Sequence, residues 1–315
     1  FSFAKEKLIL NDQNQGVNIA PYLSFFKDTN SIYFLEDILK EKAFIQNIQK
    51  NPNIAYTKAT IWGKFTIQNK TNKQWFLEVS EVILDSLIFY IPIENDKYIV
   101  QKAGLFVIDS NNYYQTNRYV YDLKVEPNSQ KTYFFKVKSI RLQFPMNVLP
   151  FAKLIQKNHQ HDLADGVYYG FVMIMFLYNL FLFFSTKDKN YLLYVLYLFT
   201  SGFYIFWIKG HFTEFISVDY LWLNKYGVTF SSLSGMTSII FSVYFLELKK
   251  HLKNMFYTLM IMFYILIIPI VLNFMGYNLF ASKITQLIIF FSFFIIIISA
   301  FFSYVKGYNF CLLYT

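Results

Sequence analysis

The chain has 315 residues, of which 55% are hydrophobic and 22% aromatic, and its formal net charge is +9. Residues 1–164 carry a net charge of +5 and residues 165–315 a net charge of +4, so no basic tail or patch indicates nucleic-acid binding. The single cysteine, Cys311, excludes an intrachain disulfide, so the polar first half must be held together by its hydrophobic core.

The first half is predicted to consist mainly of strands. Residues 31–47 are compatible with a short amphipathic helix that has Leu35, Ile38 and Leu39 on one face. In residues 61–68 apolar and polar positions alternate, which is typical of a strand with one buried face.

Further strands are predicted at short intervals, and the first of them is expected to form a hairpin with 61–68 across the polar turn 69–73. Their predicted ranges are 74–79, 86–92, 119–125 and 132–139. Several short strands at this spacing predict an all-β, jelly-roll-like sandwich.

A polar segment, 151–165, is expected to connect the two halves in an extended conformation. It contains His159, His161 and Asp162, and imidazole and carboxylate groups suit zinc. In an extended chain the two histidines would point the same way, but no second cluster supplies further ligands. We therefore expect a solvated linker and no metal site.

The second half is predicted to be a bundle of membrane-spanning helices. Residues 166–185 contain no charged residue, and about 20 such residues span a hydrocarbon core of roughly 30 Å. Pro269 predicts a kink in the fourth span. The predicted spans are 166–185, 191–208, 227–246, 255–274 and 284–304, with a sixth beginning near Phe310.

These patterns divide the chain into a β-sandwich domain, residues 1–160, and an α-helical polytopic membrane domain, residues 161–315. The loops after spans one, three and five hold six lysines, and the loops after spans two and four hold three. Because lysine is enriched in cytoplasmic loops, the first set is expected to be cytoplasmic and the sandwich extracytoplasmic. Phe1 is not Met and Thr315 falls just inside an apolar segment, so we expect the sequence to be a fragment.

Stretches in both halves carry a resemblance to one family. They are Ile61–Asn69, Leu84–Ile91, Thr132–Val137, Tyr168–Gly170, Leu177–Phe183, Lys187–Tyr194 and Lys209–His211. In this order they resemble the bacterial seven-transmembrane receptors with diverse intracellular signalling modules (7TMR-DISM), and the first half resembles the type 2 extracellular domain of that family. The resemblance implies a jelly-roll sensor for carbohydrate-like or other small ligands, seven helices, and a cytoplasmic output module such as a histidine kinase or a diguanylate cyclase.

Four side chains are candidate ligand contacts: Trp62, Trp75, Tyr90 and Arg118. Aromatic rings stack on sugar rings, and a guanidinium offers a planar set of donors. Trp62 lies on the polar face of its strand, so partial exposure is expected. The alternative is that the aromatic residues fill or cover the sandwich core and that Arg118 pairs with a carboxylate such as Asp85.

In the first span, Tyr178 and Asn179 are candidates for helix packing or signal transmission, because intramembrane amides often bond between helices. No Asp, Glu, Lys or Arg lies deep within a predicted span. Ion-coupled transporters and proton pumps usually need such groups, so the sequence disfavours these classes.

We therefore predict a multi-pass sensor of the bacterial inner (plasma) membrane with a periplasmic N-terminal domain. It would bind a small molecule and signal to an output module that this sequence lacks. One alternative is a transporter or channel with an extracytoplasmic accessory domain. The other is a membrane-bound enzyme, for which His211, Glu214 and Asp219 form a set that resembles an ordinary loop.

No catalytic, phosphate-binding or metal-binding motif is recognisable in the sequence. We therefore expect no enzyme activity, no cofactor and no nucleic-acid partner in these residues. The expected partners are a small-molecule ligand, membrane lipid and a second copy of the chain, since a dimer suits kinase and cyclase outputs.

Overall fold

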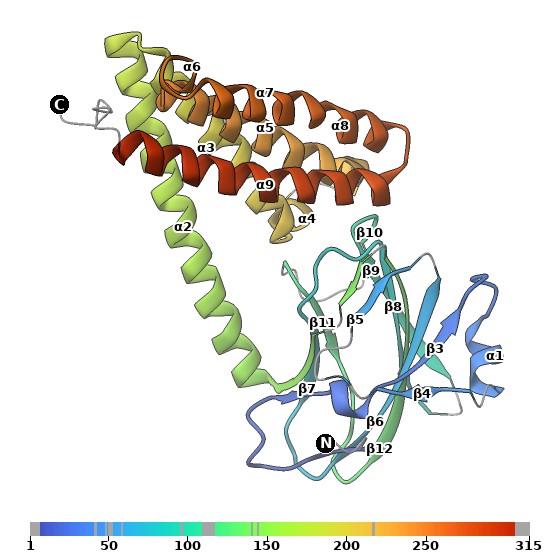
Figure 1. Cartoon of the computed structure of the whole chain (residues 1–315). Coiled ribbons are helices and arrows are strands. Elements are labelled where there is room, and N and C mark those ends of the chain that lie inside the picture. Colours follow the sequence, from blue (N-terminus) through green and yellow to red (C-terminus); the bar gives the residue numbers. More distant parts are fainter. Residues whose placement is uncertain are drawn as a thin grey trace. The chain divides into compact units, whose positions relative to one another are not determined.

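The computed structural model describes residues 7–40, 43–47, 49, 53–57, 59–94, 97–108, 117–139, 141–143, 145–215 and 218–305. They form two compact units (Figure 1). The first contains Phe1–Leu163 and Lys209–Trp222, and the second contains Ala164–Ile208 and Leu223–Thr315. The predicted sixth span, with Cys311, lies outside the described residues.

The first unit is a β-sandwich, as predicted. Its larger sheet, sheet A, has the strand order β10-β9-β8-β12-β6-β3-β4. Strand β1 also belongs to it and pairs in parallel with the C-terminal end of β6. The strands of sheet A are β1 (Leu8–Leu10), β3 (Ser24–Asp28), β4 (Ile45–Gln46), β6 (Thr60–Asn69), β8 (Ser86–Pro92), β9 (Tyr98–Gly104), β10 (Val107–Ile108) and β12 (Gln130–Lys138).

The smaller sheet, sheet B, has the order β11-β7-β14-β2. Its strands are β2 (Val17–Asn18), β7 (Trp75–Val79), β11 (Tyr119–Asp122) and β14 (Met146–Pro150). A separate pair joins β5 (Asn53–Tyr56) and β13 (Arg141–Gln143), and two short helices complete the unit, η1 (Ala20–Tyr22) and α1 (Leu35–Lys40).

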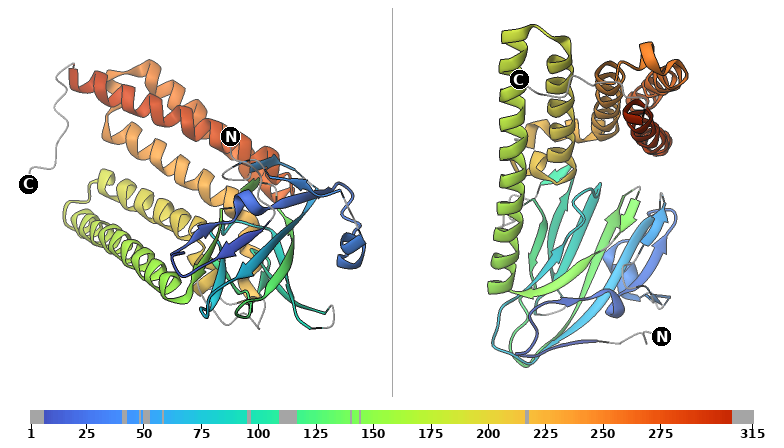
Figure 2. Two further views of the ribbon diagram at one scale, coloured as in Figure 1. Left: turned by 90° about the horizontal axis from the view of Figure 1, so that it is seen from below. Right: turned by 60° about the vertical axis from the view of Figure 1, so that its left-hand side comes forward.

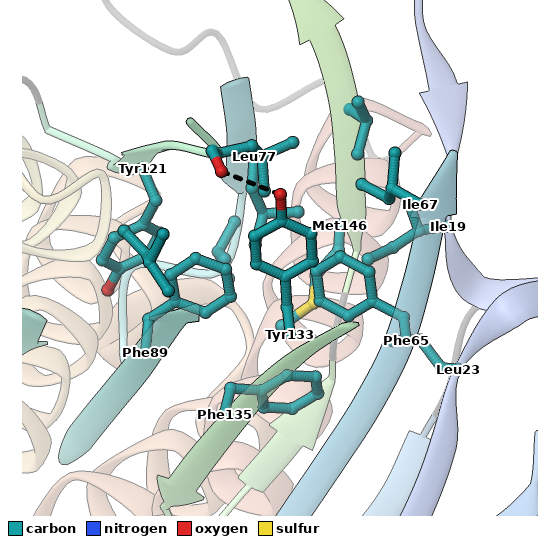
Figure 3. Packing of buried hydrophobic residues seen from close by; sticks show 14 of the residues in the cluster. Ile19, Leu23, Phe65, Ile67, Leu77, Phe89, Tyr121, Tyr133, Phe135 and Met146 are labelled. Atoms are coloured by element: carbon teal, nitrogen blue, oxygen red, sulfur yellow. Dashed lines mark hydrogen bonds between the residues drawn. The ribbon is translucent and has the colours of Figure 1, made fainter. Parts of the chain in front are cut away.

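The core of the sandwich lies between the two sheets and is rich in aromatic rings (Figure 3). Phe65 and Phe89 of sheet A stack on Tyr133 with ring centroids 5.2 and 5.9 Å away. The Tyr133 hydroxyl donates to the Leu123 carbonyl oxygen at 2.8 Å, which satisfies the polar end of a fully buried ring. Phe135 lies over its cross-strand neighbour Gly63, where a side chain at residue 63 would collide with the ring.

The strands predicted at 61–68 and 86–92 are confirmed as β6 and β8, and those at 119–125 and 132–139 as β11 and β12. The hairpin between 61–68 and 74–79 is wrong. The connecting residues carry the chain from sheet A to sheet B, where β7 pairs with β11 and β14. Asn69 stabilises this corner, because its side chain accepts from the Thr71 N–H at 3.0 Å and donates to the Val125 carbonyl at 3.2 Å.

The predicted extended connector is also wrong, because helix α2 begins at Phe151 and continues unbroken to Thr186. His159 and His161 therefore lie two residues apart on a helix, where side chains do not face each other. Helix α1 is shorter than the predicted 31–47 segment, and Leu39 is exposed whereas Ile38 is buried.

The second unit is an α-helical bundle whose five long apolar helices are sufficient to cross a membrane, counted over the described residues. After α2 come α3 (Lys189–Ile208), α5 (Gly227–Phe245), α7 (Lys253–Ile265) with α8 (Ile267–Phe274), and α9 (Asn278–Val305). Helices α7 and α8 together form one of the five, Lys253–Phe274. Between them lie the short elements α4 (His211–Phe215), η2 (Val218–Tyr226) and α6 (Leu248–His251). Helix α5 packs against both α3 and α9 (Figure 2).

Polar side chains join the helices of the bundle. The hydroxyls of Thr200 and Thr237 lie 2.7 Å apart between α3 and α5, and those of Ser232 and Thr285 lie 3.0 Å apart between α5 and α9. The predicted kink is found at Leu266, which separates α7 from α8, because Pro269 cannot donate a backbone hydrogen bond to the preceding turn.

Asn179 was expected to form a hydrogen bond to another helix, but its side chain bonds within its own helix. Its amide donates to the Met175 carbonyl of the same helix at 2.8 Å, although the side chain is buried. The neighbouring Tyr178 is largely exposed in the isolated bundle. Any role of this pair in signal transmission stays a prediction, as does the domain boundary at residue 160, which α2 crosses without interruption.

Candidate functional site

The outer face of sheet A carries a second group of aromatic side chains, separate from the core. Alternate residues of β6, β8 and β12 point away from sheet B, and residues of 29–40, which include α1, and of 43–47 cover part of this surface. We call it the aromatic face; its members are Phe26, Tyr33, Leu35, Ile38, Phe44, Trp62, Tyr90, Tyr98 and Phe134.

Trp62 and Tyr90 stack at the centre of the aromatic face, with ring centroids 5.7 Å apart and an interplanar angle of 19°. Trp62 is completely buried, so the expectation of partial exposure is wrong; α1 and Lys136 lie over a surface that strand alternation alone leaves open. Its indole Nε1–H has no hydrogen-bond acceptor in the part of the chain that the structure describes. Tyr90 is half-buried, and burial raises the pKa of its phenol, which keeps the hydroxyl protonated.

Two lysines lie over the rings of the aromatic face. The ammonium of Lys136 is 5.1 Å from the centre of the Trp62 ring and donates to the Tyr33 carbonyl oxygen at 3.2 Å. The ammonium of Lys64 is 4.7 Å from the centre of the Phe44 ring. Cations in such positions are attracted to the faces of aromatic rings.

The other two sequence candidates lie elsewhere. Trp75 belongs to the core between the sheets, where its Nε1–H donates to Thr71 Oγ1 at 3.0 Å. Arg118 donates to the Glu78 carboxylate at 2.9 Å, so it contacts a structural carboxylate, as the alternative interpretation expected. The structure therefore brings together Trp62 and Tyr90 and separates both from Trp75 and Arg118.

Sequence reasoning missed Glu78, which is fully buried on the outer face of sheet B. Its two carboxylate oxygens accept from Arg118 and from Lys157 of α2. Beside this triad, Leu154 of α2 packs with Phe76, Val120 and Leu149. An acidic residue inside the apolar strand 75–79 is the signal that could have identified this site.

The α3–α5 segment Lys209–Trp222 belongs to the sandwich unit. The Asn117 amide donates to the Lys209 carbonyl at 3.1 Å, and the next residue, Gly210, has φ +84° and packs its backbone against Asn117 and Val82. His211 Nδ1 and Glu214 Oε2 lie 2.9 Å apart in this segment. Across the described residues no three His, Cys, Asp or Glu side chains gather as metal ligands would.

Family comparisons agree with this architecture. The family model described as 7TM diverse intracellular signalling matches residues 161–315. The model described as 7TMR-DISM extracellular 2 matches residues 20–149. A search of curated protein sequences finds no match.

The fold and these matches define a multi-pass membrane receptor with an extracytoplasmic N-terminal β-domain. The chain belongs to the 7TMR-DISM family, with an extracellular domain of type 2.

Proposed function

We propose that the chain is the sensor part of a bacterial inner-membrane receptor that binds a small, ring-shaped ligand on the aromatic face. A carbohydrate-like ligand fits the resemblance of the extracellular domain. The signal would pass through the helices to a cytoplasmic output module. The observation that carries the proposal is helix α2, whose first turns pack on sheet B and which then continues without a break as the first apolar helix.

The coupling proposed for α2 depends on how its first turns are held. Lys157 contacts the buried Glu78 carboxylate, and Phe151 lies against Phe76 with ring centroids 5.5 Å apart. A change in sheet B would therefore reach the helix directly. A ligand shifts such an equilibrium only by the difference in its affinity for the two states, so the proposal requires unequal binding.

The first test is a thermal-shift screen of the full chain in lipid nanodiscs against sugars, amino acids, nucleosides and organic acids. Because a ligand of the folded state stabilises it by mass action, a specific compound should raise the melting temperature by several degrees. Tyr90→Ala should remove that shift, since it removes the half-buried ring of the aromatic face. A shift that persists in Tyr90→Ala, or a screen without any shift, would count against this binding site.

The proposed orientation has its own test. A fluorescent reporter fused after Lys250 should be active and a phosphatase fused there inactive, because short loops rich in lysine lie on the cytoplasmic side of the membrane. The matched control is the same pair of fusions after Tyr220, where the result should be reversed. A phosphatase active after Lys250 would overturn the proposed orientation.

A further inference from the structure

We infer that the ligand of the aromatic face carries a carboxylate, which accepts hydrogen bonds from the Lys136 ammonium and the Trp62 indole N–H. This inference rests on the proposed function, and it adds the charge of the ligand and the two side chains that select it.

The first observation is the buried indole N–H of Trp62. The side chain is 0% exposed, and its Nε1 lacks an acceptor among the described residues. Trp75, the other buried tryptophan of the sandwich, donates its Nε1–H to Thr71 Oγ1. Leaving a buried donor unpaired costs about 1–3 kcal/mol, so such a group needs an explanation, and an absent acceptor supplies one.

The second observation is the cation beside this donor. Lys136 forms no ion pair within the described part of the chain; its ammonium has a carbonyl oxygen at 3.2 Å and the rings of Trp62 and Phe34 at 5.1 and 5.9 Å. Lysines 73, 131 and 157 of the same unit each pair with a carboxylate. Lys136 can therefore exchange a neutral partner for an anionic one by moving only the end of a flexible side chain.

Sheet A presents further lysines on this face, while α1, which covers part of it, adds Glu36, Asp37 and Lys40. Lys138 lies on the same face of the sheet as Lys136, because it follows Lys136 by two residues along β12. Lys64 also lies on this face, because it follows Trp62, the cross-strand neighbour of Lys136, by two residues along β6. Asp28, a buried carboxylate on the same face, accepts from the N–H groups of Ile32 and Tyr33 at 3.2 and 3.1 Å, so both of its oxygens already have donors. A positively charged aromatic surface is complementary to an anion with a flat ring.

The indole N–H lies in the plane of the ring and is shielded from solvent, so a carboxylate would reach it at the ring edge after the side chains that cover it move aside. There it would satisfy both groups at once, with the end of the Lys136 side chain turned from the ring face toward that edge. One oxygen would accept from the ammonium and the other from the indole N–H, and hydrogen bonds to a charged partner are roughly twice as strong as neutral ones. The ring of the ligand would then lie toward the half-buried Tyr90, which stacks with Trp62.

The test compares two matched pairs of probes, glucuronate with glucose and galacturonate with galactose, by calorimetry on the full chain in lipid nanodiscs. The acids should bind about tenfold or more tightly than the neutral sugars, the difference expected for one charged hydrogen bond. Lys136→Met should remove most of this difference and should weaken neutral sugars much less than the acids. Trp62→Phe should weaken the acids by about fivefold. The cavity left by the smaller ring lowers the melting temperature of the ligand-free protein, and removal of the unpaired donor offsets part of that loss.

Lys64→Met is the matched control, since Lys64 also lies over a ring of the aromatic face but beside no unpaired donor. It should reduce the preference for acids much less than Lys136→Met does, because Lys64 contributes only to the charge of the surface. Equal, Tyr90-dependent binding of acids and neutral sugars would overturn the inference and leave the proposed function intact. Acid binding that survives Lys136→Met would also overturn it, and no binding of either probe at this face would count against both.

Discussion

Glu78→Ala is expected to destabilise the sandwich by about 3 kcal/mol, the lower end of the range for breaking a buried ion pair. The carboxylate is 0% exposed, and its loss leaves Arg118 and Lys157 without the anion that both contact. Their side chains are 17% and 28% exposed, so water compensates in part. Hydrogen exchange of the full chain in nanodiscs should show faster exchange in β7, β14 and the first turns of α2.

The matched control for this variant is Glu126→Ala, which removes a carboxylate from an exposed ion pair. Glu126 is 72% exposed and pairs with Lys131 at 3.0 Å. An exposed pair contributes about 0–1 kcal/mol, so exchange should remain close to that of the unmodified chain. Equal effects of the two variants would show that Glu78 does not hold α2 on sheet B.

Trp75→Ala is expected to lower the free energy of unfolding of the sandwich by about 3–5 kcal/mol, the usual cost of truncating a large aromatic side chain in a core. The indole is 1% exposed within the core cluster, and its loss also removes one of two donors to Thr71 Oγ1, the other being the Lys73 N–H at 3.2 Å. Denaturant unfolding of the full chain, followed through hydrogen exchange in β7, measures the change.

The comparison for Trp75→Ala is Tyr90→Ala, which removes a half-buried ring from the outer face of sheet A. Tyr90→Ala should cost less stability and should affect ligand binding, whereas Trp75→Ala should affect binding only through the loss of folded protein. If Trp75→Ala leaves stability unchanged but abolishes binding, Trp75 would be a ligand contact after all.

Much of the fold could be predicted because local patterns reflect local physics. The alternation in 61–68 identifies β6, since only a strand places successive side chains on opposite faces. The uncharged run 166–185 identifies an apolar helix by length and composition. The pairing partner of each strand was harder to predict. The turn after Asn69 has the composition of a hairpin turn, yet it carries the chain into the other sheet.

The candidate site could be predicted only in part, and Trp62 and Trp75 show why. Both lie on strands, and the sequence does not say which face of each strand meets the core. Trp75 faces the other sheet, whereas Trp62 is buried under a helix and a lysine on the outside of its own sheet. Alternation separates two faces of a strand, but burial depends on what covers each of them.

By itself the sequence determined the class of this protein: a β-sandwich followed by apolar helices, with the residue order of a membrane receptor family. These features follow from periodicity, hydropathy and length, which act within a few residues of chain. Only the tertiary structure decided that Glu78 is buried, that Trp62 has an unpaired donor beside Lys136, and that residues 151–157 are helical and packed on sheet B. Each of these depends on contacts between residues far apart in the chain, whose energies no local pattern contains.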